Sequence, residues 1–120
     1  IDDALPVFEA LFNKKAYKTE IVESEFVKTA FIKVGDSKIE LLEATNENSA
    51  IAKFLVKNRS GFHHIAFDVD DLEAEINRLN NEGFTLIHQT PKKGADNKRI
   101  AFLHPKSTEG MLIELCEENS

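Results

Sequence analysis

The chain has 120 residues, 42% of them hydrophobic and nine of them phenylalanine, and a formal net charge of −6. This composition predicts a single folded domain, excludes an intrinsically disordered protein, and argues against nucleic acid as a general partner. The sequence has one cysteine, no apolar run of membrane-spanning length, and no signal-peptide pattern at its start. We therefore expect a cytoplasmic protein with no disulfide framework and no membrane partner.

The first 60 residues are expected to form one helix, three strands and a polar link. Asp2 or Asp3 can cap the helix, whose apolar residues recur at helical spacing. These residues are Leu5, Phe8, Leu11 and Phe12. The strands are expected over residues 17–22, 27–34 and 38–44. The turn Gly35-Asp36-Ser37 separates the last two strands, and the link over residues 45–60 contains a helical piece around Ile51–Val56.

The second half is expected to begin with a strand over Phe62–Val69, in which His63 and His64 point to opposite faces. His63 shares its face with Ile65 and Phe67 and is expected to pack there. His64 lies on a face with small and acidic side chains, which makes it a candidate metal ligand. A hydrogen-bonded core histidine is the alternative, because histidine is often partly buried.

A second helix is expected to follow, capped by Asp70 with Glu73 placed to reciprocate and ended by Gly83. Its buried stripe is predicted to consist of Leu72, Ile76 and Leu79. Three further strands are expected over residues 84–89, 99–104 and 111–117. A loop over Thr90–Lys98 separates the first two of these strands.

The two halves of the chain repeat one strand–helix–strand–strand–strand pattern. The matching segments are Asp2-Asp3 with Asp70-Asp71, Ala30-Phe31-Ile32 with Ala101-Phe102-Leu103, and Ile39–Glu43 with Ile113–Glu117. We predict an α+β fold in which two tandem βαβββ modules form a curved mixed sheet within one domain. The predicted boundaries are repeat 1 at residues 1–45, a linker at 46–60 and repeat 2 at 61–118. The first strand of repeat 1, with its equivalent of His64, is expected upstream of Ile1 and absent from this sequence.

Two glutamates occupy matching positions of the repeat. Glu114 lies in a strand that is apolar on both faces, and Glu40 lies between an isoleucine and a leucine. A buried carboxylate is unfavourable unless it is paired or binds a metal, although an exposed ion pair with Lys38 remains open for Glu40. With His64 they form a candidate ligand set around which the sheet would curve. One nitrogen and two oxygen donors suit Co²⁺, Mn²⁺, Fe²⁺, Ni²⁺ or Zn²⁺ better than Ca²⁺.

Several segments carry a resemblance to a known family. They are Asp36-Ser37-Lys38-Ile39-Glu40-Leu41-Leu42-Glu43, His63-His64-Ile65-Ala66-Phe67, Pro91-Lys92-Lys93-Gly94-Ala95, Ala101-Phe102-Leu103-His104-Pro105-Lys106-Ser107 and Ile113-Glu114-Leu115. Together with the paired βαβββ repeat, they resemble the vicinal oxygen chelate superfamily, and within it the methylmalonyl-CoA epimerases. The similarity covers essentially the whole chain.

This resemblance implies an epimerase that interconverts (R)- and (S)-methylmalonyl-CoA by α-proton abstraction through an enolate. It implies that His64, Glu114 and Glu40 bind one divalent metal ion, with Co²⁺ favoured and Mn²⁺, Ni²⁺ or Zn²⁺ as alternatives. Glu114 would also be a catalytic base. The second base stays open, because Thr29 occupies the position at which a carboxylate is expected, and water or Glu40 could replace it. The family also implies a homodimer.

Basic residues gather late in the chain. Residues 92–106 contain five lysines and arginines against Asp96 alone. Within this segment, Lys98 and Arg99 are predicted to contact the phosphates of CoA, with solvated surface charge as the alternative.

Two alternative functions also remain. One is a glyoxalase-like or dioxygenase-like metalloenzyme with the same ligands. The other is a metal-free binding module, which the absence of tryptophan and the single tyrosine disfavour.

Overall fold

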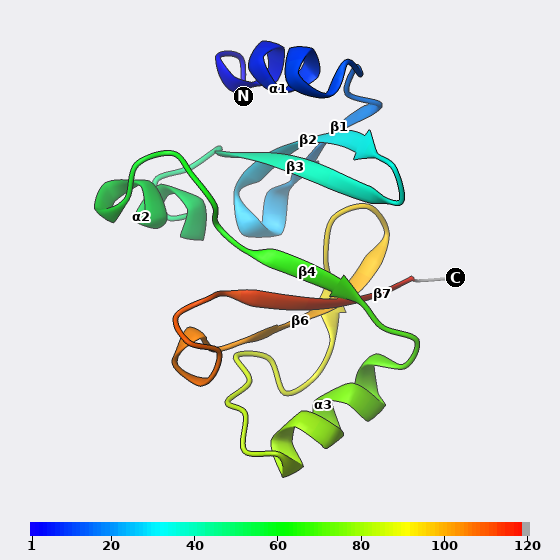
Figure 1. Ribbon diagram of the computed structural model, residues 1–120. Helices are drawn as coiled ribbons and strands as arrows, with labels where there is room; N and C mark the ends of the chain where they lie inside the picture. Colours follow the sequence, from blue (N-terminus) through cyan, green and yellow to red (C-terminus); the bar gives the residue numbers. More distant parts are fainter. Residues whose placement is uncertain (119–120) are drawn as a thin grey trace. The chain divides into compact units, whose positions relative to one another are not determined.

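The computed structural model describes residues 1–118 and divides the chain into two units, Ile1–Gly61 and Phe62–Ser120. Each unit combines helices with a β-sheet, so the predicted α+β class is confirmed (Figure 1). Among the described residues, no helix has both the length and the apolar character needed to cross a bilayer.

The first unit is built on an antiparallel sheet in the order β1-β2-β3. Its strands are β1 (Lys18–Val22), β2 (Val27–Val34) and β3 (Ser37–Ala44), and the short 3₁₀ turn η1 (Glu23–Glu25) joins the first two. Aromatic and β-branched residues favour the extended central strand β2, where Phe31 and Ile32 are fully buried. Gly35 and Asp36 form the tight turn into β3, and Gly35 adopts a φ of 62°, which glycine tolerates best.

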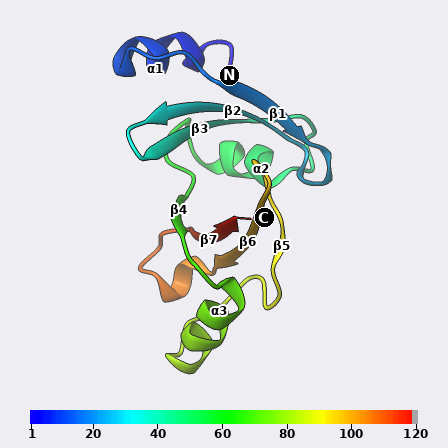
Figure 2. The ribbon, with the colours of Figure 1, turned by 90° about the vertical axis from the view of Figure 1, so that its right-hand side faces the viewer.

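Two helices cover this sheet. Helix α1 (Ala4–Phe12) contacts β2, and helix α2 (Ala50–Lys57) contacts β3. Both views place the two helices on opposite faces of the sheet (Figure 2). At the start of α2, Ser49 Oγ accepts the backbone N–H of Ala52 at 2.9 Å, as expected for an N-cap.

Helix α1 differs from its prediction in two respects. Asp3 is the N-cap, but its side chain accepts no capping hydrogen bond. Leu11 belongs to the predicted apolar side of the helix, yet it is 67% exposed. It lies at the outer edge of the apolar stripe, beside the exposed Val7, so only part of the predicted stripe faces the sheet. The partly buried members of the stripe are Leu5, Phe8 and Phe12.

The second unit contains a mixed sheet in the order β4-β7-β6-β5, with β4 parallel to β7. Its strands are β4 (Ile65–Asp68), β5 (Lys92–Lys93), β6 (Lys98–Leu103) and β7 (Ile113–Glu118), and the 3₁₀ turn η2 (Pro105–Ser107) lies between β6 and β7. Helix α3 (Leu72–Asn81) packs on β6 and β7. The buried cluster between them consists of Leu72, Ile76, Leu79, Leu86, Ala101, Leu103 and Leu115.

The cap of α3 lies one residue later than predicted. Asp71, not Asp70, is the N-cap, and its carboxylate accepts the backbone N–H of Ala74 at 3.1 Å. With Asp71 as the N-cap, Glu73 lies at the second helical position instead of the third that a capping box requires, and Arg99 binds its carboxylate. The remaining predictions for this helix are confirmed: the buried stripe is Leu72, Ile76 and Leu79, and Gly83 follows with a φ of 91°.

The strand predicted over Phe62–Val69 is shorter than expected. Its ladder begins at Ile65, which pairs with Ile113, the first residue of β7. His63 and His64 therefore precede the ladder, and they are not forced to opposite faces of the sheet.

The strand predicted over residues 84–89 was wrong. It is reduced to a single bridge between Leu86 and Leu103. Next to this bridge, the backbone N–H of Phe102 donates to Nδ1 of His88 at 3.1 Å instead of to a backbone carbonyl. This side chain satisfies the donor that a continuing strand would need, so the ladder stops. The short strand β5 then forms inside the segment predicted as a loop.

The pairing registers of the two sheets confirm the internal repeat. In the first unit, Ala30, Phe31 and Ile32 pair with Leu41, Glu40 and Ile39. In the second unit, Ala101, Phe102 and Leu103 pair with Leu115, Glu114 and Ile113. Each of the two predicted glutamate ligands thus lies opposite a phenylalanine at the same place of its unit. Within residues 1–61, no strand equivalent to β4 precedes α1.

Gly94 lies tightly against Ile100 of β6. A Cβ at this position would lie 2.7 Å from Cγ2 of Ile100, which is itself buried. We expect Gly94→Ala to lower the free energy of unfolding by about 1–3 kcal/mol, because Ile100 must shift in a packed environment. Urea unfolding measures this change. Gly61→Ala is the matched control, since its Cβ would meet only the carbonyl oxygen of Arg59 at 3.9 Å. Equal stabilities of the two variants would contradict the close packing.

Candidate functional site

In the second unit, one face of the sheet packs against α3 and the other carries Glu114. Residues alternate between the faces of a strand, so Ile113 and Leu115 face α3 while Glu114 and Cys116 face the other side. We call this second side the Glu114 face. Its residues on the three long strands are Ala66, Asp68, Lys98, Ile100, Phe102, Glu114, Cys116 and Glu118.

His64 and Glu114 lie together on the Glu114 face. His64 Nε2 is 3.1 Å from Glu114 Oε1, and the two side chains are only 15% and 12% exposed. The ring of Phe102 meets the imidazole of His64 edge-on, with the ring centroids 5.4 Å apart. Low exposure strengthens the interaction between the imidazole and the carboxylate relative to water. The structure therefore brings together two of the three side chains that the sequence predicts as metal ligands.

His63 was predicted to share the face of Ile65 and Phe67, but it precedes the strand ladder that begins at Ile65. Its Nδ1 instead lies 2.9 Å from Nδ1 of His64, and the two rings are perpendicular. Burial, followed by the proximity of His64, lowers the pKa of His63. This partner of His64 was missed because the sequence pattern extends the strand through both histidines.

His88 is a second residue that the sequence analysis missed. Its imidazole lies 5.8 Å from the ring of Phe102, measured between ring centroids, so Phe102 contacts both His64 and His88. Nδ1 of His88 accepts the backbone N–H of Phe102, which leaves Nε2 as the protonated nitrogen of the neutral ring. No sequence pattern marks this histidine, because its position follows from the interruption of the ladder.

Glu40, the third predicted ligand, lies in the first unit on β3. Its Oε2 is 4.0 Å from Nζ of Lys38, so the ion pair left open by the sequence is present at a long distance. Nζ of Lys38 and Nζ of Lys18 lie 5.0 Å and 5.2 Å from the ring centroid of Phe31. Glu40 thus lies opposite the buried Phe31 in its unit, and Glu114 lies opposite the partly buried Phe102 in the other.

Lys98 lies on the Glu114 face at the far end of β6. Its Nζ is 2.7 Å from Oε1 of Glu118 and 3.2 Å from Oδ1 of Asp68. Burial acts to lower the pKa of Lys98, but the hydrogen bonds to these two carboxylates outweigh it and raise the pKa above its ordinary value. The ammonium group is therefore charged and held within the sheet.

Arg99 lies on the α3 face of the same strand. It donates to Glu73 at 2.6 Å and to Glu117 at 2.8 Å, and the bond to Glu73 raises the pKa of Arg99 and lowers that of Glu73. Together with Asp71, these carboxylates place three oxygens within 4.8 Å of one another. Glu117 also accepts the backbone N–H of Leu72 at 2.6 Å. This cluster fastens the start of α3 to the sheet, and Arg99 forms ion pairs with two of its three carboxylates.

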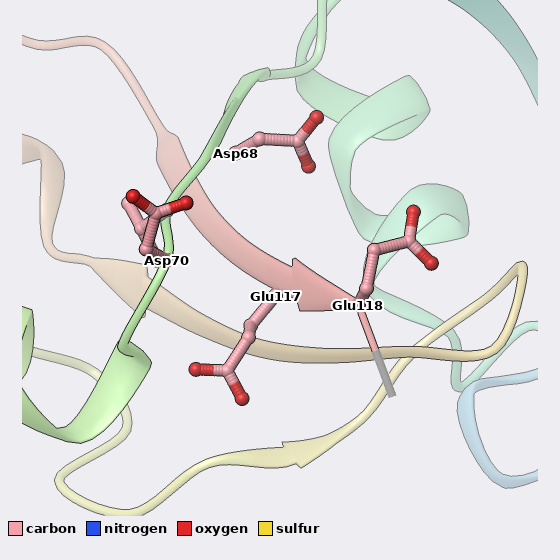
Figure 3. Close-up of a pocket in the computed structure, with 5 residues that line it drawn as sticks. Asp68, Asp70, Glu117 and Glu118 are labelled. Atoms are coloured by element: carbon pink, nitrogen blue, oxygen red, sulfur yellow. The ribbon is translucent and has the colours of Figure 1, made fainter. Parts of the chain in front are cut away.

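A cavity of about 380 Å³ lies where β4 and β7 end (Figure 3). It is lined by Asp68, Val69, Asp70, Glu117 and Glu118. Figure 3 shows the carboxylates of Asp68 and Glu118 turned to one side of β7 and that of Glu117 to the other. Four carboxylates repel phosphate groups, so this cavity does not suit an anionic substrate.

Cys116 is buried on the Glu114 face, with Sγ 3.5 Å from Oδ1 of Asp68. Burial, followed by the nearby carboxylates of Glu114 and Asp68, raises the pKa of the Cys116 thiol from 9.0 to about 12. Because the thiolate is the reactive form, we expect the folded protein to react slowly with a disulfide reagent at pH 8 and the urea-unfolded chain to react rapidly.

The same pKa shift predicts how stability depends on pH. The unfolded chain loses the thiol proton at a lower pH than the folded chain does. The protonated Cys116 thiol therefore contributes its full stabilisation of the folded state below pH 9, and this contribution is lost as the pH rises toward about 12. Thiol reactivity that is equally fast with and without urea would contradict the burial of Cys116.

Comparison with known proteins shows the family to which this chain belongs. A profile of the Glyoxalase/Bleomycin resistance protein/Dioxygenase superfamily matches residues 1–102. The mitochondrial methylmalonyl-CoA epimerase of Dictyostelium discoideum is 45% identical over 93 residues, which are 77% of this chain and 56% of that protein. An ethylmalonyl-CoA/methylmalonyl-CoA epimerase of Cereibacter sphaeroides is 44% identical over 91 residues, which are 74% of this chain and 68% of that protein.

Solved structures of methylmalonyl-CoA epimerases also match this chain. A variant of the Streptomyces coelicolor methylmalonyl-CoA epimerase, in complex with 2-nitronate-propionyl-CoA, is 34% identical and superposes with a TM-score of 0.93. The match covers 99% of this chain and 87% of that one. The chain is therefore similar to these epimerases in fold as well as in sequence.

Proposed function

Because this chain belongs to the Glyoxalase/Bleomycin resistance protein/Dioxygenase superfamily, we propose that it is an isomerase that interconverts (R)- and (S)-methylmalonyl-CoA. The observation that carries the proposal is the little-exposed pair of His64 and Glu114. This pair lies in a chain that resembles methylmalonyl-CoA epimerases over three quarters of its sequence and nearly all of its fold.

The donor atoms of this pair fit one divalent metal ion. Ligands that bind one ion at right angles, each about 2.1 Å away, lie about 3 Å apart, close to the Nε2–Oε1 distance of 3.1 Å. We propose His64 and Glu114 as ligands, with Glu40 as the third on the basis of its equivalent register. Nitrogen and carboxylate donors suit several divalent metals. We propose Co²⁺ as the bound ion, with Mn²⁺, Ni²⁺ or Zn²⁺ as alternatives. A bound ion would supply a Lewis acid for the negative charge that develops on substrate oxygens.

Glu114 is proposed to be the residue that moves the proton. Its carboxylate takes the proton from the carbon between the substrate carboxylate and the thioester, and the electron pair of the broken C–H bond remains in the enolate. Return of a proton to the opposite side of that carbon inverts it. Thr29 occupies the position where a second base is expected. It is buried, and its side chain is a hydroxyl instead of a carboxylate. Glu40 or a water molecule remains the proposed second proton carrier.

The CoA portion is proposed to contact basic residues of β6. Of the two predicted contacts, Lys98 shares the Glu114 face, but Asp68 and Glu118, which line the acidic cavity, bind its ammonium group, so a CoA phosphate would have to displace these carboxylates. Arg99 lies on the other face, where Glu73 and Glu117 bind it. The homodimer and the cytoplasmic location stay predictions from the sequence.

The test is exchange of the α-proton. The purified protein, supplied with Co²⁺ in D₂O, is expected to place deuterium at the α-carbon of methylmalonyl-CoA and to interconvert the two forms, and His64→Ala is expected to abolish both. Turnover of a glutathione hemithioacetal or a catechol instead would identify a glyoxalase-like or dioxygenase-like enzyme. Binding of methylmalonyl-CoA without exchange would identify a binding module.

A further inference from the structure

The contact between His63 and His64 is unusual for neighbours in a strand. Consecutive strand residues point to opposite faces, yet these two imidazoles meet at 2.9 Å between their Nδ1 atoms. The contact is possible because the ladder of β4 begins only at Ile65. Both ring nitrogens of His64 are consequently engaged, Nδ1 by His63 and Nε2 by Glu114.

The partners of His64 determine where its hydrogen lies. An ionised carboxylate only accepts hydrogen bonds, so the bond to Glu114 places the hydrogen of neutral His64 on Nε2. Nδ1 of His64 is then an acceptor. The 2.9 Å contact between the Nδ1 atoms therefore requires His63 to carry its own hydrogen on Nδ1 and to donate it.

We propose that His63 is a positioning residue that orients the imidazole of His64 toward Glu114 in both the metal-free and the metal-bound protein. The proposal rests on the proposed function, because it takes His64 Nε2 as the metal-binding atom. Metal binding needs the lone pair of Nε2, so the hydrogen of His64 must then lie on Nδ1 and point to His63. His63 would change from donor to acceptor.

An imidazole can make this change without moving. The bridging hydrogen passes from Nδ1 of His63 to Nδ1 of His64, Nε2 of His64 releases its proton to solvent, and Nε2 of His63 takes one up. The numbers of protons and charges on the pair stay the same. A phenylalanine at position 63 could fill the space but could make neither hydrogen bond. A glutamine could make either one, through the donor and acceptor ends of its amide.

Nitrogen NMR of ¹⁵N-labelled protein tests this inference directly, because it distinguishes the two histidine tautomers. We expect Nδ1–H on His63 and Nε2–H on His64 without metal, and the reverse on both residues with Zn²⁺, a diamagnetic probe. Titration with Zn²⁺ supplies the second readout. His63→Phe is expected to weaken Zn²⁺ binding about 10- to 100-fold, and His63→Gln to recover part of the loss. His104→Phe, at an exposed histidine of the turn before η2, is the matched control and should bind Zn²⁺ as the wild type does.

The outcomes separate this inference from the proposed function. A metal-free His63 with its hydrogen on Nε2, or a His63→Phe variant that binds Zn²⁺ as tightly as the wild type, would overturn the positioning role. If the wild type binds no Zn²⁺, the proposed metal site fails, and the metal-free tautomers alone decide whether His63 orients His64. If Zn²⁺ binding and its dependence on His63 are found without α-proton exchange, only the proposed epimerase activity fails.

Discussion

Replacing Glu114 with glutamine is expected to reduce α-proton exchange in methylmalonyl-CoA by about 10²- to 10⁴-fold, the usual contribution of one positioned acid–base group. The change keeps the size of the side chain and removes the basic oxygen that lies 3.1 Å from Nε2 of His64. An amide oxygen can still accept a hydrogen bond from His64, so the fold should survive. Exchange in D₂O, followed by mass spectrometry under single-turnover conditions, measures the loss without interference from product release.

A matched carboxylate separates this effect from the loss of charge. Glu75 lies on α3 and forms an exposed pair with Arg78, so Glu75→Gln makes the same chemical change away from the Glu114 face. Its exchange rate should equal that of the wild type, and its stability should change by less than about 1 kcal/mol. An exchange rate for Glu114→Gln within tenfold of the wild type would remove Glu114 from the proposed chemistry.

The matching halves of the sequence predicted that both units share one pattern, and the registers of the two sheets agree with it. The apolar segments around Phe31 and Glu40 recur, in the same order, around Phe102 and Glu114. The structure pairs Phe31 with Glu40 and Phe102 with Glu114. A one-residue slip would turn every side chain to the other face, so such patterns define register strongly. The predicted family is confirmed by the match of its profile to residues 1–102 and by the identity to its members.

The surroundings of His64 could not be predicted in this way. His63 contacts His64, and His88 contacts Phe102, the aromatic neighbour of His64. Both histidines lie where strand pairing is interrupted. Alternation along a strand describes side chains only where the ladder is continuous. At His88, the ring nitrogen competes with the backbone for the N–H of Phe102, and no local propensity records that competition.

The cap of α3 failed for a related reason. Asp70 and Asp71 are equally good caps by residue type, so the sequence could not select Asp71. Arg99, 26 positions from Glu73, binds the carboxylate that the predicted capping box required. Lys98 and Arg99 were likewise treated as one basic patch in the sequence. Their consecutive positions on β6 place them on opposite faces with different carboxylate partners.

Removing the side chain of Phe31 is expected to lower the free energy of unfolding by about 3–5 kcal/mol, a large share of the 5–15 kcal/mol typical of a domain. Phe31 is 0% exposed, and its ring lies 5.8 Å from that of Tyr17, measured between centroids. Lys18 and Lys38 place their ammonium groups over the same ring, so Phe31→Ala also removes two cation–π contacts. Urea unfolding followed by circular dichroism measures the loss.

Phe62 provides the matched control for this prediction. It is 94% exposed, so Phe62→Ala deletes the same side chain from the surface and should change the unfolding free energy by less than about 0.5 kcal/mol. Phe31→Leu retains most of the buried volume and should lie between the two, which keeps the series measurable even if Phe31→Ala does not fold. Equal stabilities of the Phe31 and Phe62 variants would contradict the central place of Phe31 in the first unit.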